Sequence, residues 1–283
     1  MDERPQPGKL YGTPAGVSLA RALANAGAFI FTTADARRLA PRDVRVSQIP
    51  ALLKLMVDAG WLVRLRRDLY AGTGRLPGGV DVPAFAVATA LVTPSAVSHW
   101  SALAHHDLTD QVPVVVTVTT PRKVVVPSMR STSASGEARH VWRAGGVQCQ
   151  FVTVREPRYF GIDSVWIDDR FRVPITDRER TVLDLFAMPG FFGGLAEGMA
   201  VLERAQGDLD LGKLVEYGVR YGTVAAAKRL GWALEHTGAS AAAVEPLRRV
   251  AASHYSLLDP GRVRRGHHDR LWMVIDNLAA ASS

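Results

Sequence analysis

The segment from Gly72 to Gly79 constrains the fold more than any other, because four of its eight residues are glycine and a fifth is proline. A stretch of this composition is too flexible, and contains too many breakers, to form a helix or a central strand. We therefore predict a linker over residues 72–81. It separates an N-terminal domain, residues 1–71, from a larger domain, residues 82–283. The total of 283 residues is enough for two domains of ordinary size.

The basic charge is concentrated in the predicted N-terminal domain. Residues 1–71 contain eleven Lys or Arg and six Asp or Glu, a net charge of +5, whereas the other 212 residues contain 23 and 21, a net charge of +2. A localised basic excess is typical of proteins that bind polyanions. If the protein binds nucleic acid, we expect the N-terminal domain to make the contact.

The start of the N-terminal domain predicts two helices and a short strand. A helix is predicted over residues 18–26, where apolar side chains recur at helical spacing. Residues 29–31 predict a short apolar strand. Thr32 or Thr33 can then cap a short helix that extends to Leu39.

A third helix is predicted to begin at Ser47 and to end at Gly60. Ser47 is expected to cap it, and Pro50 falls in the first turn, where a missing N–H costs no helical hydrogen bond. Its predicted buried stripe is Ile49, Leu52, Leu53 and Met56.

The hydrophobic period changes from 3.6 to 2 after Gly60. Residues 61–65 and 69–71 predict two short strands, with Arg66–Asp68 between them as a basic hairpin tip. The order helix, strand, helix, helix and hairpin is typical of a winged helix-turn-helix, in which the third helix enters the major groove and the hairpin lies along the DNA backbone.

Guanidinium groups bind phosphate oxygens in two-point contacts, and a glutamine can pair with adenine through two hydrogen bonds. Free N–H groups at the start of the third helix are expected to bind phosphate as well. We predict the DNA-binding residues Arg42, Arg45, Ser47, Gln48, Ala51, Lys54, Arg64, Arg66 and Arg67. In this set Gln48, Ala51 and Lys54 read bases. Short helices followed by a hairpin also form protein-docking modules, so an adaptor without DNA affinity is an alternative.

The larger domain is predicted to be a mixed α/β domain. Helices are predicted over residues 83–91, 95–106, 178–187, 195–206, 211–221 and 223–236, and strands over residues 114–120, 139–142, 148–155, 164–167 and 171–174. Because the strands cluster before the helices, this order favours an α+β fold with a mostly antiparallel sheet. The polar residues 127–136 predict a surface loop.

The histidine-rich patch at residues 98–107 is the strongest indication of an enzyme. Ser101 and His105 are four residues apart on the predicted helix, and His99 and His106 are seven apart, so each pair can share a face. No nucleophile elbow or zinc-binding helix motif surrounds them. We therefore predict no catalytic residues, metal site or cofactor. The alternative is a nucleic-acid hydrolase that uses His99, His105 and His106.

Several features bear on the compartment. The sequence has no run of about 18 apolar residues and begins with acids and prolines instead of a secretion signal. Cys149 is the only cysteine, so no internal disulfide can form. We expect a cytoplasmic protein. The basic run at residues 261–270 is interpreted as a solvated loop.

Four stretches of the chain match the motifs of one family. They are Pro94–Pro113, Asp177–Leu185, Lys228–Gly238, and Gly60–Arg64 together with Leu69–Tyr70. In these stretches the chain resembles the AbiE-type antitoxins, the transcriptional-regulator half of type IV abortive-infection toxin–antitoxin pairs. The matches occur in the right order and span nearly the whole chain.

The resemblance implies a winged-helix domain that binds inverted repeats in its own promoter, with possible cooperative assembly on the DNA. It also implies a C-terminal domain that counters a nucleotidyltransferase-like toxin, directly or indirectly. Proteins of this family are not themselves enzymes. Their wings commonly carry glycine next to the arginine at the tip, whereas here Asp68 follows Arg67.

Overall fold

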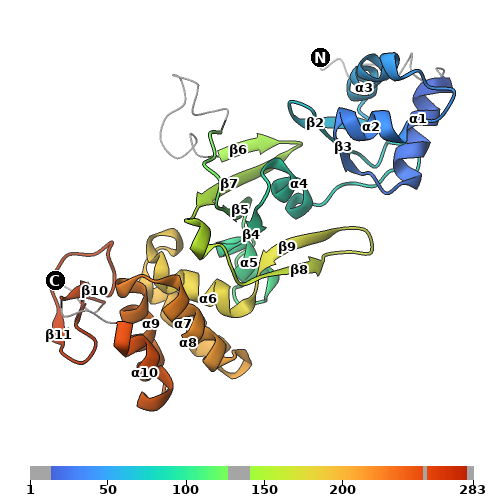
Figure 1. The fold of residues 1–283 in the computed structure, drawn as a ribbon. Helices are drawn as coiled ribbons and strands as arrows, with labels where there is room; N and C mark the ends of the chain where they lie inside the picture. Colours follow the sequence, from blue (N-terminus) through green and yellow to red (C-terminus); the bar gives the residue numbers. More distant parts are fainter. Residues whose placement is uncertain (1–13, 127–140, 251–253, 279–283) are drawn as a thin grey trace. The chain divides into compact units, whose positions relative to one another are not determined.

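The computed structural model describes residues 14–126, 141–250 and 254–278 (Figure 1). The chain divides into two compact units. The first comprises Met1–Thr93, Val125–Cys149 and Trp166–Val173, and the second comprises Pro94–Val124, Gln150–Val165 and Pro174–Ser283. Within the described ranges, we find no helix with the length and apolar character needed to cross a membrane.

The described residues of the first unit contain four α-helices. These are α1 (Pro14–Asn25), α2 (Thr33–Leu39), α3 (Ile49–Asp58) and α4 (Ala84–Leu91), and a 3-10 turn, η1 (Val46–Gln48), precedes α3. The predicted cap of α2 is confirmed at Thr32. Its hydroxyl accepts a hydrogen bond from Asp35 N at 3.2 Å, and the Asp35 carboxylate accepts one from Thr32 N at 3.1 Å. This reciprocal capping box fixes the residue at which α2 begins.

The start of α3 differs from the prediction. Ser47 lies inside η1, and no described side chain makes a capping hydrogen bond to α3. The 3-10 turn takes the place of the cap, since Gln48 N–H donates to Arg45 O at 2.9 Å. The prediction that Ser47 caps α3 is therefore wrong. Pro50 does lie in the first turn, as predicted.

A three-stranded antiparallel sheet packs with these helices. Its strands are β1 (Ile30–Phe31), β2 (Leu62–Arg66) and β3 (Leu69–Gly72), in the order β1-β3-β2. The hairpin predicted from the change of period is thus confirmed. The predicted stripe of α3 lies in one buried cluster with Leu19 and Leu23 of α1 and Phe31 of β1.

Residues 74–78, in the predicted linker, form turns and a bend. Thr73 N–H donates to Trp61 O at 3.0 Å, and Gly74 N–H donates to Asp81 Oδ1 at 2.8 Å. Gly72 is the last residue of β3 and donates its N–H to Phe29 O at 2.8 Å. The boundary at residues 72–81 remains a sequence-based prediction.

In the described part of the chain, six strands form a mixed sheet. They are β4 (Ala96–Val97), β5 (Val115–Thr120), β6 (Val141–Ala144), β7 (Val147–Thr153), β8 (Ile162–Trp166) and β9 (Arg172–Thr176), in the order β6-β7-β5-β4-β9-β8. Strand β4 pairs antiparallel with β5 and parallel with β9. The predicted mixed α/β composition is confirmed.

The described residues of the second unit contain six α-helices. They are α5 (His99–His105), α6 (Arg178–Ala187), α7 (Leu195–Ala205), α8 (Leu211–Tyr221), α9 (Val224–His236) and α10 (Ala241–Val250). Helix α6 is central, because it contacts α5, α7, α8 and α9. A small sheet of β10 (Ser256–Leu257), β11 (His267–Asp269) and β12 (Val274–Asp276) follows, in the order β10-β12-β11.

One helix predicted in the larger domain is wrong, and one helix present there was missed. The helix predicted over residues 95–106 is in fact strand β4 followed by α5, because Val97 pairs with both Val118 and Ile175. Helix α10 was not predicted at all, and it contains Pro246. The predicted loop over residues 127–136 and the start of the strand predicted over residues 139–142 lie outside the described residues.

The stretches Asp177–Leu185 and Lys228–Gly238 contribute most of the buried helices α6 and α9. Arg180 is fully buried and donates to Asp184 Oδ1 at 3.1 Å and to Phe160 O at 2.8 Å. Lys228 is also fully buried and donates to the backbone carbonyl of His254, and burial lowers the pKa of its amine. These basic side chains therefore link backbone segments inside the unit.

Candidate nucleic-acid interface

Helix α3 presents the predicted base-reading residues to solvent. Gln48, Ala51 and Lys54 are exposed. The opposite side of the helix is buried, with Ile49, Leu53 and Met56 fully inaccessible and Leu52 nearly so. This division into a buried and an exposed side follows from the helical period, which places the apolar residues on one face and the predicted reading residues on the other.

The start of α3 has fewer free backbone donors than we predicted. The N–H of Gln48 donates to Arg45 O, the N–H of Ile49 donates to Val46 O, and Pro50 has none. Contacts to an anion at this end must therefore come mainly from side chains. Arg42, Arg45 and Ser47 are exposed there.

The basic residues of the prediction form no ion pair in the described part of the chain, although the charge of Arg66 helps to lower the pKa of the Asp68 carboxyl. They are Arg42, Arg45, Lys54, Arg64, Arg66 and Arg67, and all six are exposed. None forms an ion pair with a carboxylate in the ranges 14–126, 141–250 and 254–278. Their charges remain available to an external anion.

The β2–β3 hairpin lies against α3, because β2 packs directly on that helix. A register shift between Arg64 and Arg66 interrupts the β2–β3 pairing. The shift leaves Leu65 buried between two exposed arginines, and a Cβ on Gly145 would approach Leu65 Cδ2 to 2.8 Å. The bulge thus anchors the hairpin through one apolar side chain while Arg64 and Arg66 stay in solvent.

Asp68 joins the tip of the hairpin to the start of α2. Its φ of 58° is left-handed, the conformation that a glycine would adopt freely. Its Oδ1 accepts a hydrogen bond from Thr33 N at 3.1 Å, and hydrogen bonding from Thr33 lowers the pKa of the Asp68 carboxyl below its ordinary value. The carboxylate is therefore directed to a backbone amide of α2. Sequence reasoning did not find this contact, since its two residues are 35 positions apart.

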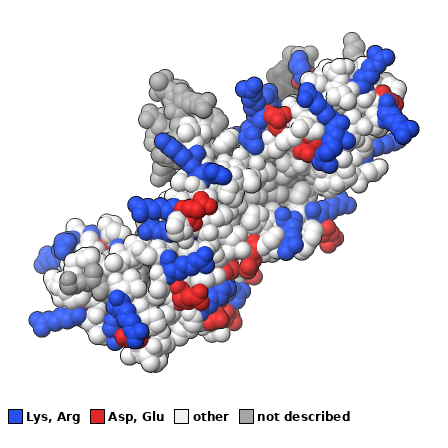
Figure 2. Space-filling model, viewed as in Figure 1, with Lys and Arg blue, Asp and Glu red and all other residues white. Residues whose placement is uncertain are grey.

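The charges of the first unit are visible on its surface (Figure 2). Lys and Arg side chains lie over the face shown, with fewer Asp and Glu side chains between them. This agrees with the net charge of +5 for residues 1–71. Clustered positive charge favours association with a polyanion through counterion release.

The histidine patch of the second unit is engaged in internal contacts. His99 is fully buried, its Nδ1 lies 2.8 Å from Ser98 Oγ, and burial lowers the pKa of its ring. His106 Nε2 lies 2.7 Å from Thr176 O, and Ser101 Oγ accepts from Thr117 N at 2.9 Å. His99 and His106, which were predicted to share a helix face, therefore do not form an exposed pair. No group of three or more His, Cys, Asp or Glu in the described residues is arranged to hold a metal ion.

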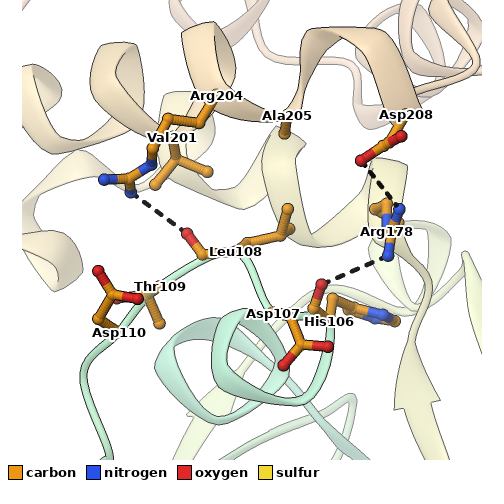
Figure 3. Close-up of a pocket in the computed structure, with 10 residues that line it drawn as sticks. All are labelled: His106, Asp107, Leu108, Thr109, Asp110, Arg178, Val201, Arg204, Ala205 and Asp208. Atoms are coloured by element: carbon orange, nitrogen blue, oxygen red, sulfur yellow. Dashed lines mark hydrogen bonds and ion pairs between the residues drawn. The ribbon is translucent and has the colours of Figure 1, made fainter.

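A hollow of about 210 Å³ lies beside this patch in the second unit (Figure 3). Arg204 donates to Leu108 O at 3.3 Å, and Arg178 donates to His106 O at 3.4 Å and lies 3.9 Å from Asp208. Both arginines thus bind the loop that follows α5. The arrangement stabilises this loop and offers no activated nucleophile.

Comparison with known proteins gives a similarity of fold. No protein-family model matches the chain, and no curated protein matches it. Among solved structures, the chain is similar to the RV2827C protein from Mycobacterium tuberculosis, with a TM-score of 0.60 and 14% sequence identity over 95% of this chain and 96% of that one. At this identity the likeness concerns the fold alone.

Proposed function

We propose that the chain is a DNA-binding transcriptional autorepressor and the antitoxin of a toxin–antitoxin pair, and that it is not an enzyme. The first unit would act as a winged helix-turn-helix, with α3 in the major groove and the β2–β3 hairpin as the wing. On an inverted repeat, two such domains would sit about 34–36 Å apart, one helical turn of DNA, or a multiple of it.

One observation carries the DNA-binding part of the proposal. The nine residues predicted to bind DNA lie on two adjoining elements, η1–α3 and the β2–β3 hairpin, or just before them, and all nine are exposed. Exposed cations without a paired carboxylate reduce the stability of the folded protein only slightly. They gain most when a phosphate backbone replaces their counterions.

The antitoxin part of the proposal rests on the resemblance to AbiE-type antitoxins. It gives the second unit a nucleotidyltransferase-like toxin as its target, bound directly or countered indirectly, and a cytoplasmic setting. Against the alternative of a hydrolase at His99, His105 and His106 stands the burial of His99 and the use of His106 Nε2 by a backbone carbonyl.

A salt-dependent binding measurement tests the proposal. The full chain is titrated against the promoter duplex upstream of its own reading frame and against a random duplex at several salt concentrations. Arg66→Ala with Arg67→Ala should weaken binding to both duplexes alike and reduce the slope of log K against log salt by about one to two. An unchanged slope would contradict the role of the hairpin, and the lack of binding by the unaltered chain would contradict DNA binding altogether.

The same measurement separates base reading from phosphate binding. Gln48→Ala should reduce the preference for the promoter by about 1–3 kcal/mol and leave random-duplex affinity and the salt slope unchanged. For the two hairpin arginines of the salt-dependence test, the matched control is Arg170→Ala. Arg170 is an exposed arginine of the same unit and lies outside the nine residues. An equal loss on both duplexes would show that Gln48 does not read bases.

A further inference from the structure

The segment η1–α3, which holds the predicted base-reading residues, also carries the exposed large apolar side chains of its region. Across residues 14–93, only Val46 and Leu55 are large hydrophobic residues with exposed side chains, at 54% and 38%. A single exposed valine or leucine needs no explanation. Here the two belong to one continuous segment: Val46 is the first residue of η1, and Leu55 lies in α3 on the side that holds Gln48 and Ala51.

Spacing and charge indicate what such a face fits. Leu55 follows Ala51 by four residues and Gln48 by seven, so the three share one side of the helix. The exposed cations Arg45 and Lys54 flank them. A groove between two phosphate backbones matches both the cations and the apolar side chains near them.

We propose that Val46 and Leu55 cover the 5-methyl groups of thymine in the major groove, so that α3 selects A·T base pairs. The thymine methyl is the apolar group that an unmodified base pair presents in this groove. Gln48 is suited to the N6 and N7 edge of adenine, so its preference and that of the apolar pair converge on the same base pairs. This inference rests on the proposed DNA-binding function and adds the class of sequence that is read.

The test removes the methyl groups from the DNA and the apolar groups from the protein. The full chain is titrated at fixed salt against its promoter duplex and against the same duplex with deoxyuridine at every thymidine. Loss of each contacted methyl should weaken binding by about fourfold, in line with ~0.8 kcal/mol per buried methylene. Val46→Ala and Leu55→Ala should bind the two duplexes more nearly alike, whereas Val112→Ala, at a valine 89% exposed in the second unit, should behave like the unaltered chain.

The outcomes separate the inference from the function on which it rests. Failure of the unaltered chain to bind the thymidine duplex would overturn the proposed function. Equal binding to both duplexes by the unaltered chain would overturn the methyl reading and leave DNA binding intact. An equal loss on deoxyuridine DNA for all four proteins would show that the methyl groups act through DNA shape, and would overturn the assignment to Val46 and Leu55.

Discussion

Basic side chains of the two units differ in what they contact. In the second unit, Arg180 and Lys228 are fully buried and donate to backbone carbonyls and, for Arg180, to a buried carboxylate. In the first unit, Arg64, Arg66 and Arg67 are exposed, and Arg64 and Arg66 donate weakly to carbonyls of their own hairpin. A buried charge must be satisfied within the fold, whereas an exposed one is free to bind a ligand. The same residue type thus stabilises one unit and is available for binding in the other.

This comparison bears on how the resemblance to AbiE-type antitoxins is interpreted. Two of the four matching stretches, Asp177–Leu185 and Lys228–Gly238, contribute to helices whose residues are largely buried. In the proposed AbiE-type antitoxin, these two stretches would serve the internal packing of the second unit. The hairpin stretch, by contrast, exposes its Arg64 side chain. The DNA binding proposed for the chain therefore depends on the first unit, whereas the countering of a toxin is proposed for the second.

The largest loss of stability is expected from Arg180→Ala. A loss as small as that of a surface residue would contradict the difference between the buried and exposed basic side chains of the two units. Arg180 and Asp184 are both fully buried and lie 3.1 Å apart. Removing the guanidinium leaves the Asp184 charge buried without its cation, at a cost of about 3–5 kcal/mol. Hydrogen exchange of the backbone amides of α6 measures this cost. We expect the free energy of opening obtained from their exchange to fall by this amount in Arg180→Ala.

Two further variants make the Arg180 test specific. Arg178→Ala, two residues earlier and with a side chain 37% exposed, should cost less than about 1 kcal/mol. Arg180→Met combined with Asp184→Leu removes both charges and should recover part of the stability lost in Arg180→Ala. Equal losses for Arg178→Ala and Arg180→Ala would show that burial does not distinguish these arginines.

The elements best predicted from the sequence are those with a clear local period. Helices α6, α8 and α9, and the β2–β3 hairpin, each show repeated apolar positions and a recognisable end. Strand β4 has only two residues, too few for a period, and is defined by pairing with Val118 and Ile175 from distant segments. Helix α10 buries only Val244 and Leu247 and contains Pro246, which normally indicates a break.

The candidate site was predicted to a similar extent. Exposure of Ala51 and Lys54 follows from the apolar stripe of α3, which is a local pattern, whereas exposure of both Arg64 and Arg66 also involves the register shift between them. The 3-10 turn before α3 and the bond from Thr33 N to Asp68 depend on backbone geometry and on contacts between distant residues. A serine near a predicted helix start could not by itself distinguish a cap from a turn.

A smaller change in stability is expected from substitutions of Asp68, which test the contact between the hairpin tip and α2 in the first unit. Asp68→Asn keeps an oxygen acceptor for Thr33 N and tolerates a left-handed φ, so stability should change little. Asp68→Gly relieves the backbone but removes the acceptor, with a net loss of about 1 kcal/mol or less at the start of α2. Exchange of the Thr33 amide measures this. If the Thr33 amide exchanged faster in Asp68→Asn than in Asp68→Gly, the hydrogen bond from Thr33 N to the side chain at position 68 would not stabilise the start of α2.

The smallest effect is a pH dependence at the capping box of α2. Hydrogen bonds from Arg38 and Thr32 lower the pKa of the Asp35 carboxyl to about 2, from an ordinary value of 3.8. A carboxyl with a lowered pKa binds fewer protons in the folded protein, so its stabilisation is complete above about pH 4 and is lost as the pH falls toward 2. Because the Asp35 side chain is 36% exposed, solvent screening keeps the contribution small.

Urea unfolding at pH 5, 4 and 3 can detect this contribution as a difference between proteins. The free energy of unfolding of the unaltered chain should exceed that of Asp35→Asn at pH 5 by less than about 1 kcal/mol, and the gap should narrow at pH 3. Asp43→Asn, an exposed aspartate of the same unit, serves as the control. A gap that stayed constant or widened on acidification would show that the Asp35 carboxylate does not stabilise α2.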